Sequence, residues 1–152
     1  MEIHRYNGDR EALRPLFRVA DDSDQAIDAY LGDGDVLVAE RAGRIVGHAQ
    51  LVATRAGTGE LKNMAVLEEL RGAGIGRALV EAILQSARDG GLIRLLVATA
   101  AADTGNLRFY QRQGFRLRSI ERDAFSPLAG YPADLLLDGI PLRDRVWLDQ
   151  DL

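Results

Sequence analysis

The segment Arg71–Arg77 places three glycines, Gly72, Gly74 and Gly76, at alternate positions between two arginines. It follows an apolar run, Leu61–Val66, and precedes a strongly periodic stretch. Glycines let the backbone approach a ligand closely, and the free N–H groups of a first helical turn bind anions. Arginine binds phosphate oxygens through a planar fork of donors. The segment therefore predicts a diphosphate-binding site.

The spacing of these glycines separates three known kinds of phosphate loop. A P-loop requires Gly-x-x-x-x-Gly-Lys-Ser/Thr, and the only lysine of this chain is Lys62. A dinucleotide-binding fingerprint requires Gly-x-Gly-x-x-Gly, usually early in the chain, whereas here the third glycine comes one residue too soon and the segment lies mid-chain. The remaining pattern is Arg-x-x-Gly-x-Gly. The alternative interpretation is a glycine-capped turn that binds no ligand.

The elements around this segment form a strand, a helix and a second strand. Glu60–Leu67 is strand-like, and apolar residues then recur at helical spacing from Ile75 to Ala87. Asp89–Gly91 ends the helix, and Leu92–Thr99 is almost entirely apolar, as in a strand buried on both faces. The order predicts a right-handed βαβ unit with parallel strands.

The rest of the chain adds elements on both sides of this unit. Before it we expect a strand at Glu2–Tyr6, a helix from an Asp9 cap to about Ala20, a helix at Ser23–Leu31 capped by Asp22 with Gln25, and a hairpin of Val36–Glu40 with Arg44–Thr54. After it we expect a helix from Asp103 or Thr104 to Gly114, strands at Arg116–Arg122 and Arg143–Leu148, and a long loop, Asp123–Leu142, between them. The order β-α-α-β-β-β-α-β-α-β-β is mixed α/β.

Composition narrows the class of protein. The 152 residues, with 47% hydrophobic and 28% charged, predict one domain over residues 1–152. A net charge of −4 argues against a broad nucleic-acid surface. Without a long apolar run or a signal-peptide pattern, the sequence predicts no membrane partner and a cytoplasmic location. Without cysteine, and with two histidines, it predicts no thiolate nucleophile and no metal site.

Two blocks of this sequence resemble the GNAT (GCN5-related) N-acetyltransferase family. The first is Glu60–Val66 followed by Arg71–Gly76, and the second is Asn106–Tyr110 followed by Gly114 and Phe115. The resemblance covers almost the whole chain. It implies an α/β fold in which a mixed, twisted sheet of about six or seven strands is flanked by about four helices. It also implies that the fourth and fifth strands are parallel and splayed apart.

The resemblance assigns roles to both blocks. The backbone of Met64, Ala65 and Val66 is expected to bind the pantetheine arm of acetyl-CoA as an added strand does. Backbone amides of the segment Arg71–Arg77 are expected to bind the pyrophosphate, and these residues are Arg71, Gly72, Ala73, Gly74, Ile75, Gly76 and Arg77. Asn106 is expected to contact the cofactor. Tyr110, on the same helix face, is expected to approach its sulfur.

The implied reaction is direct transfer of the acetyl group from acetyl-CoA to a primary amine in a ternary complex. A protonated alkyl amine has a pKa of about 10 and must lose a proton before it attacks. A backbone N–H of Val66 or Met64 is expected to stabilise the oxyanion, and Tyr110 to protonate the departing thiolate. A catalytically inactive acyl-CoA-binding sensor is the alternative, against which the presence of both Tyr110 and Glu60 argues.

Three candidates are open for the base that deprotonates the amine. Glu60 precedes Val66 by six residues, where some family members place a catalytic glutamate. Unless a bulge intervenes, Glu60, Lys62 and Met64 should point to one side of their strand, although Glu60 also fits a strand-end surface carboxylate. His48 has a suitable ordinary pKa, but a structural histidine fits its hairpin position better. A chain of waters is the third candidate.

The acceptor pocket of the family draws on the first helical pair and on the loops near the last strands. Here these are the aspartate-rich segment Asp21–Asp35 and the long loop with Tyr131, Asp134 and Asp138. Aspartates facing the cleft would favour a small cationic amine, whereas a solvated helix face explains the same residues. Small-molecule and peptide amines both fit. Family members are often dimers, so a homodimer is also expected.

Overall fold

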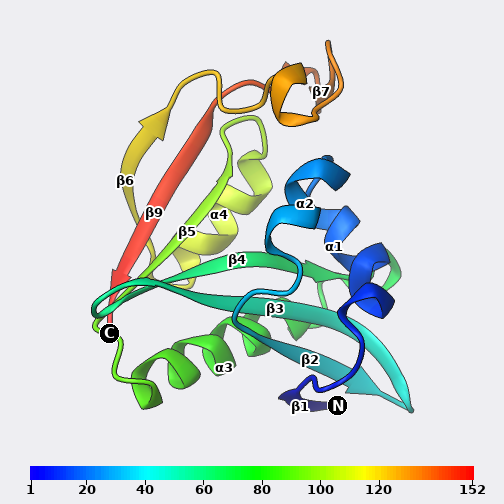
Figure 1. The fold of residues 1–152 in the computed structure, drawn as a ribbon, viewed down its shortest axis with the longest axis vertical. Helices are drawn as coiled ribbons and strands as arrows, with labels where there is room; N and C mark the ends of the chain where they lie inside the picture. The colour runs from blue at the N-terminus through cyan, green and yellow to red at the C-terminus, as the bar shows by residue number, and fades with distance from the viewer.

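In a computed structural model, which describes residues 1–152, the chain forms a seven-stranded sheet in the order β1-β2-β3-β4-β5-β9-β6 (Figure 1). Neighbouring strands are antiparallel except for β4 and β5, which are parallel. The strands are β1 (Glu2–Arg5), β2 (Asp35–Arg41), β3 (Arg44–Arg55), β4 (Thr58–Val66), β5 (Arg94–Ala100), β6 (Arg116–Glu121) and β9 (Arg145–Asp151). The predicted mixed α/β fold with a parallel β4–β5 pair is confirmed.

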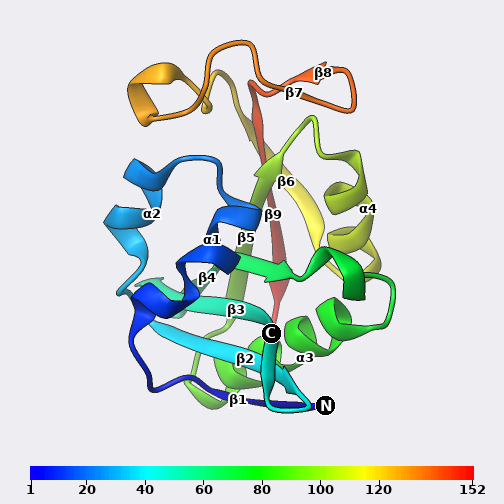
Figure 2. The same cartoon turned by 90° about the vertical axis from the view of Figure 1, so that its right-hand side faces the viewer.

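The α-helices divide between the two faces of the sheet. Figure 2 shows α1 (Arg14–Ala20) and α2 (Asp24–Tyr30) on one side, with α3 (Ile75–Asp89) and α4 (Thr104–Arg112) on the other. Short 3₁₀ turns lead into α1 and α3, at η1 (Arg10–Leu13) and η2 (Glu68–Leu70). None of these helices is both long enough and apolar enough to cross a bilayer.

The main core lies beneath α3 and α4 and extends across the sheet from β2 to β9. The apolar stripe of α3 buries Leu79, Val80 and Ile83 completely. The same core includes Leu95 and Val97 of β5, whereas Leu96 and Ala98 of that strand are only half-buried. The expectation that β5 is buried on both faces is therefore wrong, because only one of its faces packs against the helices.

A smaller core lies beneath α1 and α2. Phe17 and Ile27 are fully buried there against Val36 and Val38 of β2. The cap of α2 differs from the prediction, since Ser23 rather than Asp22 accepts a hydrogen bond from the Ala26 amide, at 3.1 Å. No residue of β5, β6 or β9 belongs to this core, so α1 and α2 cover only the β1–β4 half of the sheet.

The segment between β6 and β9, residues 123–142, has structure of its own. It holds a 3₁₀ turn, η3 (Pro127–Ala129), and a small hairpin of β7 (Leu136–Leu137) and β8 (Ile140–Pro141). Asp138 and Gly139 both have positive φ, as a tight hairpin turn requires. Figure 1 shows this segment beyond the ends of β6 and β9, beside the start of α2.

Candidate active site

The parallel pairing of β4 and β5 stops partway along the two strands. It joins Thr58–Leu61 to Arg94–Val97, and no pairing follows toward the carboxyl ends. Beyond this point the strands line a cleft of about 240 Å³, with Lys62 and Met64 on one wall and Ala98 and Thr99 on the other. Because unpaired strand edges expose backbone donors and acceptors, an extended polar ligand can add to them here.

A bulge in β4 decides which side chains enter the cleft. Gln50 of β3 is opposite Asn63, but the next β3 residue is opposite Leu61, so Lys62 has no partner. The extra residue breaks the alternation of faces beyond Lys62, because Lys62 and Asn63 both reach Tyr30 whereas Met64 packs against the main core. Glu60 and Lys62 share one side of the strand as expected, with 3.8 Å between Oε2 and Nζ.

Glu60 lies in the cleft rather than on the surface. It is only 8% exposed, and no group of the chain donates a hydrogen bond to its carboxylate apart from the long contact with Lys62. Burial raises the pKa of Glu60, and the charges of Lys62 and Arg145 oppose that rise. A partly desolvated carboxylate facing a cleft is suited to accept a proton from a bound substrate.

Tyr110 lines the same cleft from α4. Its ring packs edge-on against Phe109 and Phe115, with ring centres 5.2 and 5.8 Å away, so its direction is fixed. The hydroxyl makes no hydrogen bond within the chain, and burial raises the pKa of Tyr110, which keeps the group protonated. Tyr110 is thus a free proton donor in the cleft.

Asn106 lies one helical turn before Tyr110 and also lines the cleft. Its side-chain amide donates to the Thr99 hydroxyl of β5 at 3.3 Å. Of the two residues expected to begin this helix, Asp103 caps α4 by accepting a hydrogen bond from the Asn106 backbone at 2.9 Å. The cap and the Thr99 contact hold the start of α4 at the end of β5, beside the gap between the strands.

The glycine-rich turn presents a run of free backbone amides. No amide from Gly72 to Arg77 donates a hydrogen bond to another group of the chain. Gly72 and Gly74 both have a φ of +84°, where other residues are strained. Arg71 differs from the expectation, because its amide is already bonded to the Glu68 carbonyl at 3.2 Å. The turn therefore fits an anion with the amides of residues 72–77, beside the exposed guanidinium groups of Arg71 and Arg77.

His48 does not reach the cleft. It is fully buried and stacks on Phe17, with 4.4 Å between the ring centres. Its Nε2 donates to Oδ1 of Asn63 at 2.7 Å, and burial lowers its pKa to about 4. The structure thus favours the structural interpretation of His48 over a catalytic one.

The wall of the cleft opposite Tyr110 is built around Asp21. Its two carboxylate oxygens accept hydrogen bonds from Tyr30 at 2.7 Å and from Tyr131 at 2.8 Å. Tyr30 in turn accepts a hydrogen bond from Asn63 of β4 at 2.9 Å. Ser23 adds a second link to the long loop by donating to the Ala129 carbonyl at 2.8 Å. These bonds join the α1–α2 connection, β4 and residues 123–142 around one space.

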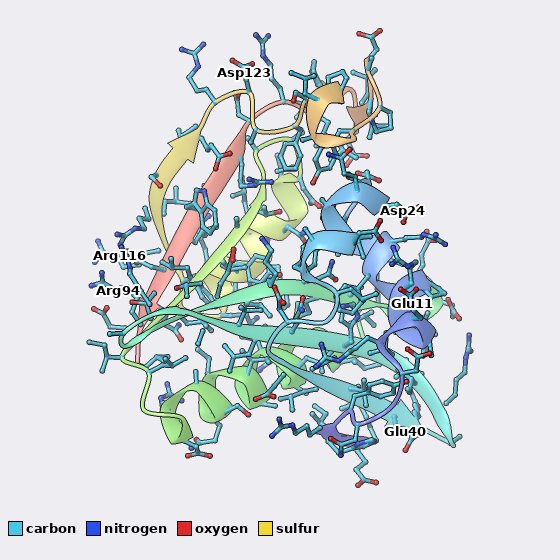
Figure 3. All side chains as sticks on the ribbon, viewed as in Figure 1. Glu11, Asp24, Glu40, Arg94, Arg116 and Asp123 are labelled. Atoms are coloured by element: carbon cyan, nitrogen blue, oxygen red, sulfur yellow. The ribbon has the colours of Figure 1, made fainter.

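Most of the aspartate-rich segment faces away from this space. Only Asp21 and Asp22 line the cleft, whereas Asp24 and Asp28 pair with arginines of α1 on the surface. Figure 3 shows Asp24 on the outside of the helical pair, near Glu11. Of the loop residues expected at the pocket, Tyr131 lines it but Asp134 and Asp138 do not.

Several cleft residues were not anticipated from the sequence. They are Tyr30 on α2, Phe125 in the long loop, and Arg145 and Trp147 on β9. Arg145 lies over the Phe125 ring at 4.9 Å and pairs with Glu121 at 3.2 Å. No local motif marks these residues, because they come from elements far apart in the chain and meet only through the sheet topology.

Comparisons with known proteins cover most of the chain. A model described as the acetyltransferase (GNAT) family matches residues 6–115. The chain is 34% identical over 142 residues to the uncharacterized N-acetyltransferase YvbK of Bacillus subtilis (strain 168), covering 93% of this chain and 90% of YvbK. The structure of IAA acetyltransferase from Bacillus cereus ATCC 14579 superposes with a TM-score of 0.91 at 35% identity, over 99% of both chains. A GNAT family acetyltransferase from Elizabethkingia anophelis with acetyl-CoA bound superposes with a TM-score of 0.91 at 30% identity, over 99% of this chain and 97% of that one.

Proposed function

Since this chain belongs to the GNAT acetyltransferase family, we propose that it transfers an acetyl group directly to a primary amine bound beside Glu60. Acetyl-CoA supplies the acetyl group as a reactive thioester. The observation that carries this proposal is that Glu60 and Tyr110 line one cleft at the point where β4 and β5 stop pairing. A proton acceptor and a proton donor thus flank the gap that is suited to an extended cofactor arm.

The cofactor side of the cleft fits acetyl-CoA through backbone groups. The free amides of residues 72–77 are suited to the pyrophosphate, and Arg71 and Arg77 add charge-assisted contacts. The unpaired edge formed by Met64, Ala65 and Val66 is suited to the pantetheine arm. Asn106, at the start of α4, completes this side.

The residues around the gap divide the proton transfers between them. Glu60 accepts the proton that the ammonium group must lose, directly or through one water. A backbone N–H of Val66 or Met64 stabilises the negative charge that develops on the carbonyl oxygen. Tyr110 lines the cleft and donates its proton to the departing sulfur. The second proton, which the nitrogen loses as the amide forms, restores Tyr110. No covalent enzyme intermediate is needed, consistent with a chain without cysteine.

The acceptor is a small amine with a positive charge. Glu60, Asp21 and Asp22 are the carboxylates on the acceptor side, and Tyr30, Phe125, Tyr131 and Trp147 add aromatic faces. Carboxylates together with aromatic faces favour an ammonium group on an apolar body. A cleft of about 240 Å³ fits a small molecule or the end of a peptide.

The test is release of CoA from acetyl-CoA against a panel of amines, with the variant Y110F and the control Y6F. The panel spans polyamines, amino acids, aminoglycosides and short peptides. A thiol reagent reports only released CoA, because the protein has no thiol of its own. Release that requires one amine class, is lost in Y110F and is kept in Y6F supports the proposal. Binding of acetyl-CoA without release for any acceptor would contradict it.

A further inference from the structure

The only lysine of the chain, Lys62, lies in the acceptor side of the cleft. Its ammonium nitrogen is 3.8 Å from Oε2 of Glu60 and 4.9 Å from the centre of the Tyr30 ring. A carboxylate beside an aromatic face is a binding site for an alkylammonium group. The chain therefore already places an alkylammonium group of its own where the proposed function requires that of the acceptor.

Strand geometry brings Lys62 there. Lys62 follows Glu60 by two residues, so both side chains point to the cleft side of β4, and the bulge breaks the alternation of faces only beyond Lys62. The side chain is 35% exposed, so the ion pair with Glu60 faces solvent. A solvent-facing pair of this kind holds a flexible lysine only weakly, about 1 kcal/mol or less. Lys62 can therefore move within the cleft.

Lys62 is also within reach of the position expected for the thioester. Strand pairing ends at Leu61 and Val97, so the gap begins at the residue that carries this side chain. Met64, which is expected to bind the pantetheine arm, is two residues further along β4, about 7 Å in an extended strand. The four-carbon stem of lysine spans about 6 Å. The Nζ of Lys62 can therefore reach the start of the gap, where the thioester is expected, by rotation of its side chain alone.

We propose that Lys62 is a self-acetylation site, an inference that rests on the proposed function. The neutral Nζ of Lys62 attacks the acetyl carbon, forming a C–N bond while the thioester C–S bond breaks. Glu60 accepts the first proton, which the Lys62 ammonium group loses before the attack. Tyr110 protonates the leaving thiolate, and the second proton, which the nitrogen loses as the amide forms, restores Tyr110, so the products are acetylated Lys62 and CoA. The reaction needs no reactant besides acetyl-CoA.

Acetylation of Lys62 changes the acceptor site. The amide product has no positive charge, so it no longer pairs with Glu60 or with the face of Tyr30. It is also bulkier than the amine and remains in the cleft. We expect an acceptor amine to protect Lys62 from acetylation, because both ammonium groups use the same carboxylate. We also expect the acetylated protein to have a several-fold higher KM for its acceptor.

The experiment is intact-mass spectrometry of the full chain incubated with acetyl-CoA in the absence of any amine, followed by peptide mapping. The expected result is a gain of one acetyl group, located at Lys62 rather than at the α-amine of Met1. The gain should be absent in K62R, about ten-fold slower or more in Y110F and E60Q, and unchanged in Y6F. The fraction modified per unit time should not change on dilution of the protein, as expected for a reaction within one chain.

The outcomes separate this inference from the proposed function. CoA release with an amine acceptor while Lys62 stays unmodified would overturn self-acetylation and leave the proposed function intact. Equal modification in the parent, Y110F and E60Q would show a purely chemical reaction and overturn it too. Acetylation at Lys62 that depends on Tyr110, in a chain that acetylates no amine of the panel, would support self-acetylation and count against the proposed acceptor class.

Discussion

The two sides of the cleft are built in different ways. The cofactor side consists mostly of backbone groups from β4 and the glycine-rich turn, a stretch that is continuous in the sequence from Met64 to Arg77. The acceptor side consists of side chains from the α1–α2 connection, β4, β9 and the segment 123–142. Asp21 alone links two tyrosines that are about a hundred residues apart in the chain.

This difference predicts which changes each side tolerates. A backbone site depends on φ and on free amides, so most side chains around it can change, whereas replacing a glycine of positive φ strains the backbone that binds the ligand. A side-chain wall depends on the atoms of a few residues, so one substitution alters what it binds. Substitutions of side chains should therefore leave the ligand of the cofactor side unchanged, whereas on the acceptor side they should change which amine is bound.

Tyr110 lies where the two sides meet, and its loss should have the largest effect. We expect Y110F to lower kcat by about 100-fold, because the leaving thiolate loses its proton donor. The KM values for acetyl-CoA and for the acceptor should change little, since a phenylalanine ring keeps the packing of Tyr110 against Phe109 and Phe115. Steady-state kinetics of CoA release measure both quantities. A change confined to KM would assign Tyr110 to binding and not to chemistry.

Glu60 should give the next largest effect and a distinct dependence on pH. Burial raises its pKa, so the carboxylate is lost at a higher pH than usual as the solution is acidified. The rate of the parent should rise with pH as Glu60 deprotonates. E60Q should lower kcat/KM by about ten-fold or more and lose this acidic limb. A pH–rate profile of E60Q with the same acidic limb as the parent would remove Glu60 as the base.

The glycine-rich turn can be tested against a glycine of the same conformation elsewhere. Gly74 has a φ of +84° and Gly139 a φ of +81°, and a Cβ at either would meet nothing within 4 Å. Alanine at either position should cost about 1–2 kcal/mol of backbone strain. Only G74A should raise the KM for acetyl-CoA, by about ten-fold, because Gly74 belongs to the turn whose free amides are expected to bind the pyrophosphate. Equal KM values in G74A and G139A would contradict an anion site at this turn.

Asp21 should show a smaller effect that is restricted to the acceptor. D21N removes the charge and one of the two oxygens that accept from Tyr30 and Tyr131, at a cost of about 1–2 kcal/mol in unfolding free energy. We expect a several-fold higher KM for the acceptor and an unchanged KM for acetyl-CoA. D24N is the matched control, because Asp24 is exposed and pairs with Arg18 on the surface. Urea unfolding and kinetics of both variants decide between an acceptor wall and a general loss of stability.

The same difference between the two sides explains which features of the fold and of the site can be predicted from the sequence. The order of strands and helices follows from apolar periodicity, and the glycine-rich turn is visible because its residues are contiguous. The free amides of residues 72–77 could be expected, but the bond of the Arg71 amide to Glu68 could not. That bond depends on the short turn η2, which no pattern in the sequence marks.

The acceptor side was predicted poorly for physical reasons. Aspartates crowd the segment 21–35, but helix geometry turns most of them outward to pair with arginines of α1. The bulge at Lys62 depends on the pairing of β4 with β3, which residue types alone do not specify. Ser23 caps α2 in place of Asp22 because the carboxylate of the neighbouring Asp21 accepts from the Ser23 amide and fixes the turn.

The short pairing between β4 and β5 affects how the two halves of the sheet, β1–β4 and β5-β9-β6, can move apart. On the face of α3 and α4, one continuous core crosses this pairing and joins the two halves. On the face of α1 and α2, the smaller core stops before β5, and the halves are tied by hydrogen bonds such as those of Ser23 and Tyr131 with their partners. Local opening should therefore separate the two halves of the sheet on the face of α1 and α2, while the main core keeps them joined on the other face. Hydrogen exchange should be fast in the α1–α2 connection and in residues 123–142 of the free protein, and slower once acetyl-CoA fills the gap.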